Sequence, residues 1–151
     1  MKTKPDPLLA ACLLATALLL AACSVEPEPI AYGRDTCAFC RMTIVDKTHA
    51  AQLVTRKGKQ FKYDAIECLV QNLPDWRADQ IGLLLVADYA EPGALTDAES
   101  ATYLISEGIK SPMGAYLSAF SSPEAAEVAR KEHGGILYSW ENLPKELMVE
   151  Y

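Results

Sequence analysis

The sequence predicts an α+β domain made of two small mixed sheets with helices packed on them. Short runs of β-branched and aromatic residues alternate with segments that begin like helices. The pattern of residues 61–69 also returns, with one gap, in residues 136–143, where a strand leads to an acid and a leucine. We therefore expect one domain with two related halves, at residues 32–88 and 100–151.

The chain begins with a leader segment. Lys2 and Lys4 precede an apolar run over residues 8–22 that holds only Ala, Leu and Cys apart from Thr16. A run of about 15 residues is too short to span a hydrocarbon core of about 30 Å, and it has the length of the apolar region of a signal peptide. We therefore expect residues 1–22 to be removed.

The leader ends in Leu20-Ala-Ala-Cys23, which resembles the lipobox where bacterial lipoproteins are cleaved and acylated. Lipid on Cys23 would anchor the chain to the periplasmic side of a bacterial membrane without a transmembrane helix. Ser24 stands where an Asp retains some lipoproteins at the inner membrane, so it favours the outer membrane. Residues 23–31 are expected to be an extended, lipidated tether. An ordinary signal peptide is the alternative.

Charge and size limit what the remaining chain can be. Removing 22 of 151 residues leaves 129, which is one domain over residues 32–151 after the tether. Loss of Lys2, Lys4 and Asp6 changes the formal net charge from −6 to −7. An acidic chain without a basic cluster argues against nucleic acid and against electrostatic docking to anionic lipid. It suits a cationic ligand or a basic protein partner.

In the first half, residues 50–55 and 60–63 have the composition of a β-hairpin. Asp64-Ala-Ile-Glu67 has the spacing of a capping box and opens a helix to Asn72. The apolar run Ile81–Ala87 predicts a buried strand. Residues 41–45 also resemble a strand, because they are rich in β-branched residues.

The second half follows a connection over residues 91–99. Residues 101–105 and 115–120 are predicted strands, and 136–138 is a short one. Ser122-Pro-Glu provides an N-cap, a proline at the first helical position and an acid in the first turn, so it begins a helix that ends before Gly134.

Three cysteines remain for chemistry. Cys12 leaves with the leader and Cys23 is consumed by lipid, so Cys37, Cys40 and Cys68 are left. An odd number of thiols in an oxidising compartment does not make a disulfide framework and indicates metal binding or redox chemistry.

The segment Cys37-x-x-Cys40-x-Met42 places two thiols and a thioether within six residues. Soft sulfur ligands select Cu(I), zinc or iron–sulfur clusters, and the thioether favours Cu(I) over zinc. Only three thiols are present, so a four-cysteine zinc site is excluded. A structural disulfide and a core methionine are the alternative interpretations.

Three further residues are candidate ligands. Met113 lies in Ser-Pro-Met-Gly, a turn that would present its side chain from a loop. His49 lies near the start of a predicted strand and could complete a metal site, or it could be an exposed histidine at a strand end. Cys68 falls in the predicted helix, where it could be buried or lean towards the site. We expect Met42 and Met113 to occupy equivalent positions of the two halves and to face a shared cleft.

These motifs, taken together, resemble the NosL family of copper-binding lipoproteins. The residues that carry the resemblance are Leu20-Ala-Ala-Cys23, Asp35-x-Cys37-x-x-Cys40-x-Met42-x-Ile44, Tyr63-Asp64-x-Ile66-x-Cys68 and Pro112-Met113-Gly114-x-x-Leu117-x-Ala119-Phe120. The resemblance implies two related ββα-type halves, treble-clef-like and similar to a unit of organomercurial lyase. It implies Cu(I) ligands at Cys40, Met42 and Met113, with Cys37 beside them. His49 and Cys68 are secondary candidates.

The resemblance also implies the role. Members of the family are accessory proteins that deliver copper to nitrous oxide reductase, so we expect a membrane-anchored metallochaperone and no enzyme activity. The predicted partners are nitrous oxide reductase or its assembly machinery. Two other functions stay open. One is a thiol–disulfide oxidoreductase that uses Cys37 and Cys40, and the other is a lipoprotein binding module without metal.

Overall fold

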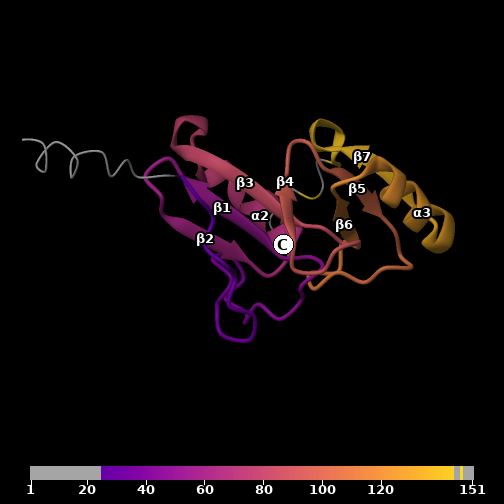
Figure 1. The fold of residues 1–151 in the computed structure, drawn as a ribbon, viewed down its shortest axis with the longest axis horizontal. Coiled ribbons are helices and arrows are strands. Elements are labelled where there is room, and N and C mark those ends of the chain that lie inside the picture. Colours follow the sequence, from indigo (N-terminus) through magenta and orange to yellow (C-terminus); the bar gives the residue numbers. More distant parts are fainter. Residues whose placement is uncertain (1–24, 145–146, 148–151) are drawn as a thin grey trace, which may run out of the picture.

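The structure is a computed structural model that describes residues 25–144 and residue 147. The predicted leader and the lipobox cysteine Cys23 lie outside the described residues. Two small sheets lie side by side, and the helices pack on them (Figure 1). The α+β class is confirmed. No helix among the described residues is both long and apolar enough to cross a membrane.

The first half contains a four-stranded sheet and one short helix. The hairpin strands β1 and β2 are followed by α2 and then by β3, which returns to pair with β1. A short strand, β4, extends the sheet and was not predicted. The bounds are β1 Ala51–Thr55, β2 Gln60–Tyr63, α2 Ile66–Asn72, β3 Ile81–Ala87 and β4 Leu95–Asp97, with 3₁₀ turns at Leu73–Asp75 and Ala78–Gln80.

The second half repeats this order of elements. Two hairpin strands are followed by a helix and by a third strand that pairs with the first. The bounds are β5 Thr102–Ile105, β6 Leu117–Phe120, α3 Pro123–His133 and β7 Ile136–Ser139, followed by a 3₁₀ turn at Trp140–Asn142. The strand orders β2-β1-β3 and β6-β5-β7 are therefore equivalent ββαβ arrangements.

This equivalence differs from the alignment that the sequence suggested. By strand order, β2 corresponds to β6 and α2 to α3, whereas the sequence pattern matched β2 and α2 with β7 and the turn after it. Met42 precedes the first strand of its half, and Met113 lies between the first and second strands of the other. The expectation that the two methionines occupy equivalent positions is therefore wrong.

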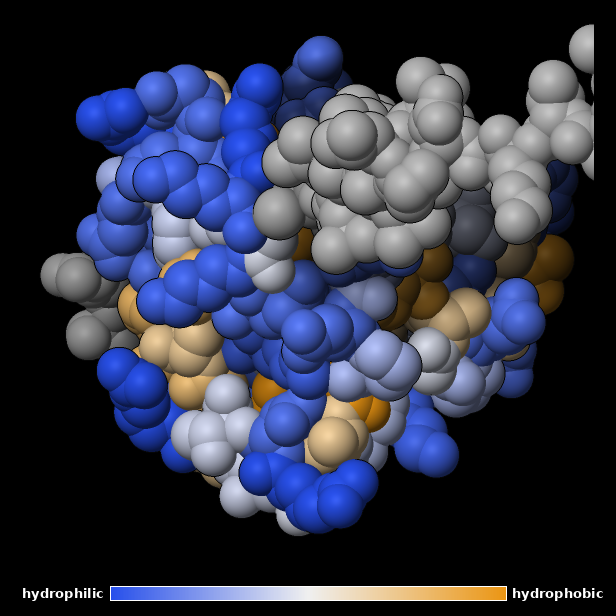
Figure 2. Space-filling view, turned by 60° about the vertical axis from the view of Figure 1, so that its left-hand side comes forward, coloured by the Kyte–Doolittle hydropathy of each residue, from blue (hydrophilic) through white to orange (hydrophobic). Residues whose placement is uncertain are grey.

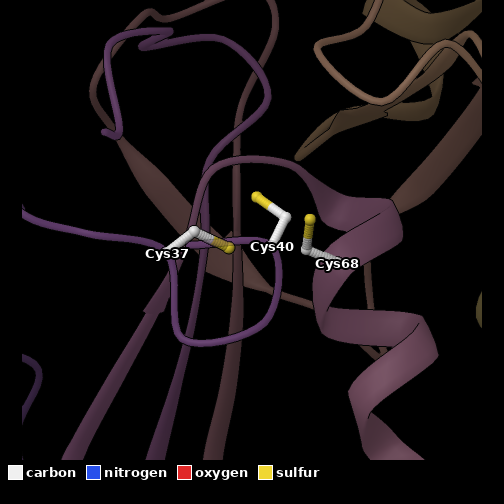
Figure 3. A group of neighbouring side chains, drawn as sticks. All are labelled: Cys37, Cys40 and Cys68. Carbon is white, nitrogen blue, oxygen red and sulfur yellow. The ribbon is translucent and has the colours of Figure 1, made fainter. Parts of the chain in front are cut away.

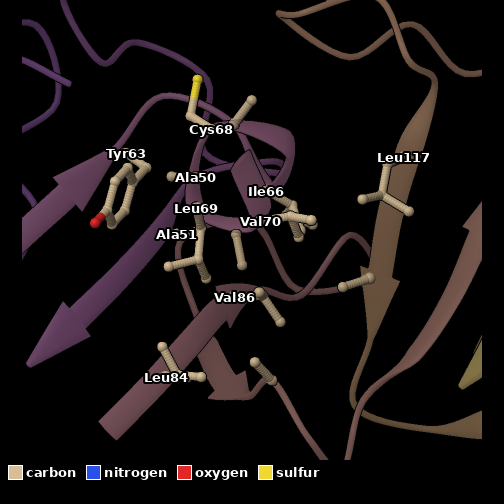
Figure 4. Close-up of a cluster of buried hydrophobic side chains, with 14 of the residues drawn as sticks. Ala50, Ala51, Tyr63, Ile66, Cys68, Leu69, Val70, Leu84, Val86 and Leu117 are labelled. Atoms are coloured by element: carbon tan, nitrogen blue, oxygen red, sulfur yellow. The ribbon is translucent and has the colours of Figure 1, made fainter. Parts of the chain in front are cut away.

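Both sheets are antiparallel within the named strands, where mixed sheets were expected. A parallel bridge between Asp88 and Ala119 joins the end of β3 to β6. The main core lies between α2 and the larger sheet, and Leu117 of β6 reaches it from the second half (Figure 4). The two halves thus share one hydrophobic core.

The segment 25–31, which was predicted to be a tether, lies on the larger sheet. The side chain of Gln52 donates to the Glu28 carbonyl, and that of Gln60 donates to the Glu26 carbonyl. Because Gln52 and Gln60 alternate with the core-facing residues of their strands, the segment covers the face of the sheet opposite α2. We call residues 25–31 the N-terminal strap.

Two local predictions are wrong. The helix α2 begins at Ile66 with Ala65 as its N-cap, and no side chain caps it. Asp64 and Glu67 are both buried, and Glu67 accepts a hydrogen bond from Ser111 instead. Residues 41–45 do not form a strand. Arg41 has φ +67°, which bends the backbone, and only Thr43 makes an isolated bridge there.

Candidate metal centre

Three thiols meet at one end of the larger sheet. The sulfur atoms of Cys37, Cys40 and Cys68 all lie within 4.8 Å of one another. Cys37 and Cys40 come from the loop that precedes β1, and Cys68 comes from the first turn of α2 (Figure 3). All three are reduced. The site therefore combines a local pair with a cysteine from a distant part of the sequence.

The loop is shaped by its own backbone. The Cys37 N–H donates to the Met42 carbonyl at 2.8 Å, and the Arg41 N–H donates to the Cys37 carbonyl at 3.2 Å. The left-handed conformation of Arg41 lets the chain reverse in so few residues. The Ala38 N–H donates to the Lys62 carbonyl, which fixes the loop to the end of β2. Cys37 and Cys40 are thus held on the same side of a tight turn.

Asp35 ties the loop to the sheet. Its carboxylate accepts from the Ala31 N–H at 2.8 Å and from Lys62 Nζ at 2.7 Å. These bonds, of which the one from Lys62 is the stronger influence, hold the pKa of Asp35 below its usual range. Asp35 thus connects the start of the cysteine loop to the N-terminal strap and to β2.

Cys68 is fixed by burial. Its helix packs into the main core, and both Cys68 and Cys37 are completely buried, whereas Cys40 is half-buried. The backbone N–H of Cys68 donates to the Ala65 carbonyl, so the residue sits in the opening turn of α2. Its side chain therefore cannot leave the site without disturbing the core.

The surroundings favour a negative charge on Cys37. A hydrogen bond from the Cys68 thiol, together with backbone N–H groups of Asp64, Cys40 and Phe39, lowers the pKa of Cys37 to about 5, although burial opposes this. The hydrogen bond to Cys37 raises the pKa of Cys68, and burial raises it further. Burial raises the pKa of Cys40. At neutral pH the metal-free site thus holds one thiolate and two thiols.

The geometry fits a metal with soft ligands. A metal about 2.3 Å from each of three sulfurs in a plane would set those sulfurs about 4 Å apart. The observed separations, all within 4.8 Å, allow this with small side-chain movements. Three sulfurs suit Cu(I), whereas a structural zinc site is completed by a fourth protein ligand.

The two methionines lie in different environments. Met42 directly follows the cysteine loop and its side chain is 56% exposed. Met113 lies in the connection between β5 and β6, is partly buried and packs against the main core. The predicted roles of Met42 and Met113 as copper ligands stay predictions.

His49 lies in a different environment from the one expected. It is 2% exposed, whereas the sequence suggested either a ligand or an exposed residue. Its Nδ1 lies 3.0 Å from Asp46 Oδ2 and 2.8 Å from Thr48 Oγ1, and its Nε2 lies 3.2 Å from Ser118 Oγ. Both ring nitrogens already have partners, so His49 connects the two halves rather than joining the three cysteines.

Two acids beside the site, Asp64 and Glu67, are buried, which was not predicted. Glu67 is fully buried and accepts a short hydrogen bond from Ser111, and burial raises its pKa. Burial, followed by the charge on Cys37, raises the pKa of Asp64, and its Oδ1 has no hydrogen-bond partner among the described residues. The spacing of Asp64 and Glu67 relative to each other was the one signal for them in the sequence, and it was interpreted as a capping box.

Comparison with known proteins places this geometry in a family. The NosL family model matches residues 30–148. A protein of Stutzerimonas stutzeri described as copper-binding lipoprotein NosL is 28% identical over 138 residues, which cover 82% of this chain and 70% of that protein. The crystal structure of the copper chaperone NosL from Shewanella denitrificans has the same fold, with a TM-score of 0.70 and 21% identity over 82% of this chain and 98% of that one. Neither relative is named for an enzymatic activity. With the family model covering most of its length, the chain belongs to the NosL family.

Proposed function

We propose that the protein is a Cu(I) metallochaperone that binds copper with Cys37, Cys40 and Cys68. The observation that carries the proposal is the convergence of three sulfurs within 4.8 Å, one of them stabilised as a thiolate before metal arrives. Copper is the cargo, so the site has to bind it and also release it. The description of the relatives as a copper-binding lipoprotein and a copper chaperone supports this role.

The exposure of the sulfurs supports transfer. Cys37 and Cys68 are completely buried, Cys40 is half-buried, and Met42 beside it is exposed. A partner's ligand can therefore reach the metal from the side of Cys40 and Met42 without opening the core. We propose Met42 as an additional thioether ligand at this opening and Met113 as a second one.

The location and client are also proposals. Acylation of Cys23 would hold the domain on the periplasmic side of a bacterial membrane, with the outer membrane favoured by Ser24. The client is proposed to be nitrous oxide reductase or its assembly machinery, on the resemblance of the motifs described above.

Disulfide exchange fits the geometry less well. Reactive thiols of oxidoreductases are partly exposed and are commonly placed at a helix N-terminus. Here the thiol with the lowered pKa, Cys37, is completely buried, and the Cys37–Cys40 segment lies in a turn. The half-buried Cys40 has a raised pKa, which makes it a poor attacking group at neutral pH.

The test is a competition titration of Cu(I) against a chromogenic chelator, with zinc in parallel. The chain from residue 23 onward carries Cys23→Ser, so that only the three site thiols remain. We expect one tightly bound Cu(I), much weaker zinc binding, and weaker Cu(I) binding in Met42→Leu. Leucine preserves the size of the side chain. Because Met42 is exposed, its replacement should not unfold the protein, so weaker Cu(I) binding would reflect the loss of the thioether.

Met113→Leu gives the matched comparison for a partly buried thioether. Weaker Cu(I) binding in either methionine variant would assign that residue as a ligand, and unchanged affinity in both would limit the site to the three cysteines. Absence of competitive Cu(I) binding, together with rapid disulfide exchange, would contradict the chaperone and favour the oxidoreductase.

A further inference from the structure

We infer that one end of the larger sheet binds the anionic headgroups of the membrane in which the chain is anchored. This end carries Arg56, Lys57 and Lys59 from the β1–β2 turn and Arg77 from the segment after α2, and we call these four residues the basic end. The inference rests on the proposed lipidation of Cys23 and is independent of copper binding.

The N-terminal strap fixes where the anchor leaves the domain. Gln52 and Gln60 hold the Glu28 and Glu26 carbonyls, each at 3.0 Å. Val25 packs over Gly82, so closely that a Cβ atom at Gly82 would lie 2.7 Å from Val25 Cγ1. The same Cβ atom would lie 3.2 Å from the Arg56 nitrogen. The described chain therefore begins beside the β1–β2 turn.

The reach of the chain then limits the distance to the bilayer. Only two residue steps separate Val25 from Cys23, and they span at most about 7 Å. Lipid on Cys23 would therefore hold the β1–β2 turn within about one Debye length of the headgroups, where charges interact despite salt. Figure 1 shows this turn and the start of the described chain together at the left-hand end of the larger sheet.

The basic end has the composition of a headgroup site. Its four cations surround an open cavity of about 490 Å³, in which Asp79 is the acidic side chain. Asp79 pairs with Arg77 at 2.6 Å, whereas Arg56, Lys57 and Lys59 have no ion-pair partner among the described residues. The net charge of −6 argued against docking to anionic lipid because no basic cluster was expected. The fold provides such a cluster by placing Arg77 beside the cations of the β1–β2 turn.

Two aromatic rings form the wall of the cavity. Phe61 and Trp76 contact each other edge to face with centroids 4.6 Å apart, and Lys59 Nζ lies 4.8 Å from the Phe61 centroid. Tryptophan has a polar tip on an apolar ring, so Trp76 flanked by lysine and arginine is typical of protein surfaces at the membrane–water interface. The side of the molecule brought forward in Figure 2 is mainly hydrophilic, with small apolar patches among the polar side chains.

The orientation has a functional meaning. Strand β2 begins next to the β1–β2 turn and ends at Tyr63, next to the loop of Cys37 and Cys40. The basic end and the thiol site therefore lie at opposite ends of β2. With the basic end on the membrane, the metal site faces away from the lipid and towards partners in the aqueous space.

The test uses the mature acylated chain, with Cys23 acylation verified by intact mass, in vesicles. One set of vesicles contains phosphatidylcholine alone, and the other also contains phosphatidylglycerol. Trp140→Phe leaves Trp76 as the one tryptophan, and a quencher on lipid headgroups reports its proximity to the surface. We expect strong quenching of Trp76 on the anionic vesicles that weakens as salt is raised.

Charge variants give the decisive comparison. Each lysine near an anionic surface changes the population whose basic end touches the lipid about fivefold, so Lys57→Glu with Lys59→Glu should lower this population by at least about 25-fold. Lys110→Glu with Lys131→Glu changes the net charge equally on exposed residues of the second half and should have no effect.

Equal quenching on both kinds of vesicle, an equal effect of both variant pairs, or an unacylated Cys23 would each overturn the inference. Cu(I) affinity of the Lys57→Glu, Lys59→Glu protein is measured separately and should be unchanged. If the parent chain does not bind Cu(I), the proposed chaperone is contradicted, whatever the vesicle experiment shows. Failure of the membrane inference and failure of the proposed function are therefore distinguishable.

Discussion

The helix of the first half, α2, and the helix of the second half, α3, hold the same place in the ββαβ order but are stabilised differently. Helix α3 has Ser122 as N-cap, which accepts the Ala125 N–H, and ends at Gly134 with φ +74°. Only two of its eleven residues are buried. Helix α2 has seven residues and no side-chain cap, and six of its residues are buried.

This difference shows which helix depends on tertiary structure. A seven-residue helix is too short to be stable by itself, so α2 persists because the core surrounds it. The capped helix α3 has local signals at both ends and buries few of its residues. The thiol site uses the helix that is fixed by packing, so Cys68 keeps its position relative to the loop of Cys37 and Cys40.

The largest expected effect is on copper. Cys68→Ala removes one of three sulfurs, and because even outer-shell partners of a metal site change affinity 10- to 100-fold, we expect Cu(I) affinity to fall by about 100-fold or more. Chelator competition measures it. Val128→Ala on the exposed surface of α3 is the control. Wild-type affinity in folded Cys68→Ala would show that α2 does not contribute to the site.

The next effect is on stability. Leu69→Ala in α2 should lower the free energy of unfolding by about 2–5 kcal/mol, because the side chain is completely buried. Val128→Ala in α3 should change it by less than about 0.5 kcal/mol, since that side chain is 63% exposed. Urea unfolding of the reduced, metal-free protein measures both. Similar losses in the two variants would remove the contrast between the helices.

A smaller effect is expected at the cap of α3. Ser122→Ala should lower the free energy of unfolding by about 1 kcal/mol, because the Ala125 N–H loses its acceptor. Ser122→Asp keeps an acceptor and should retain most of the stability. If alanine and aspartate behave alike in urea unfolding, the local signals of α3 do not stabilise it.

The smallest expected signal is the titration of one thiolate. The pKa of Cys37 is lowered from 9.0 to about 5, so the folded, reduced, metal-free protein should keep a thiolate absorbance that disappears as pH falls through about 5. The unfolded chain binds this proton near pH 9, so the stability from this group is complete above that value and is lost as pH falls towards 5. Cys37→Ser should abolish the absorbance step. A step that persists in this variant would assign the thiolate to another cysteine.

Local signals in the sequence predicted the elements that are stabilised locally. The β1–β2 hairpin and α3 were expected with nearly the observed bounds, because a turn or a cap marks each of them. Strand β4 was missed since it lies within a connection rich in Pro, Gly and Asp. The N-terminal strap could not be predicted, because its partners Gln52, Gln60 and Gly82 follow much later in the chain.

The site was predictable only where its residues are neighbours in sequence. The spacing of Cys37 and Cys40 indicated a metal site, but Cys68 could equally have been a core residue, and only the packing of α2 brings it to the other two. Asp64 and Glu67 were interpreted as a cap because the spacing of a capping box does not show whether the acids are buried. The burial of His49 was not expected either, because its partner Ser118 lies 69 residues further along the chain.

The gradient of exposure across the three sulfurs bears on the kinetics of release. An incoming thiolate meets Cys40 first, because Cys37 and Cys68 are completely buried. In the proposed chaperone, the bond from copper to Cys40 therefore breaks first, while the bonds to Cys37 and Cys68 persist. The receiving protein forms its own bond to copper before these two are lost. The residence time of copper then depends on how fast a partner docks rather than on spontaneous dissociation, so tight retention and rapid delivery are compatible in the same site.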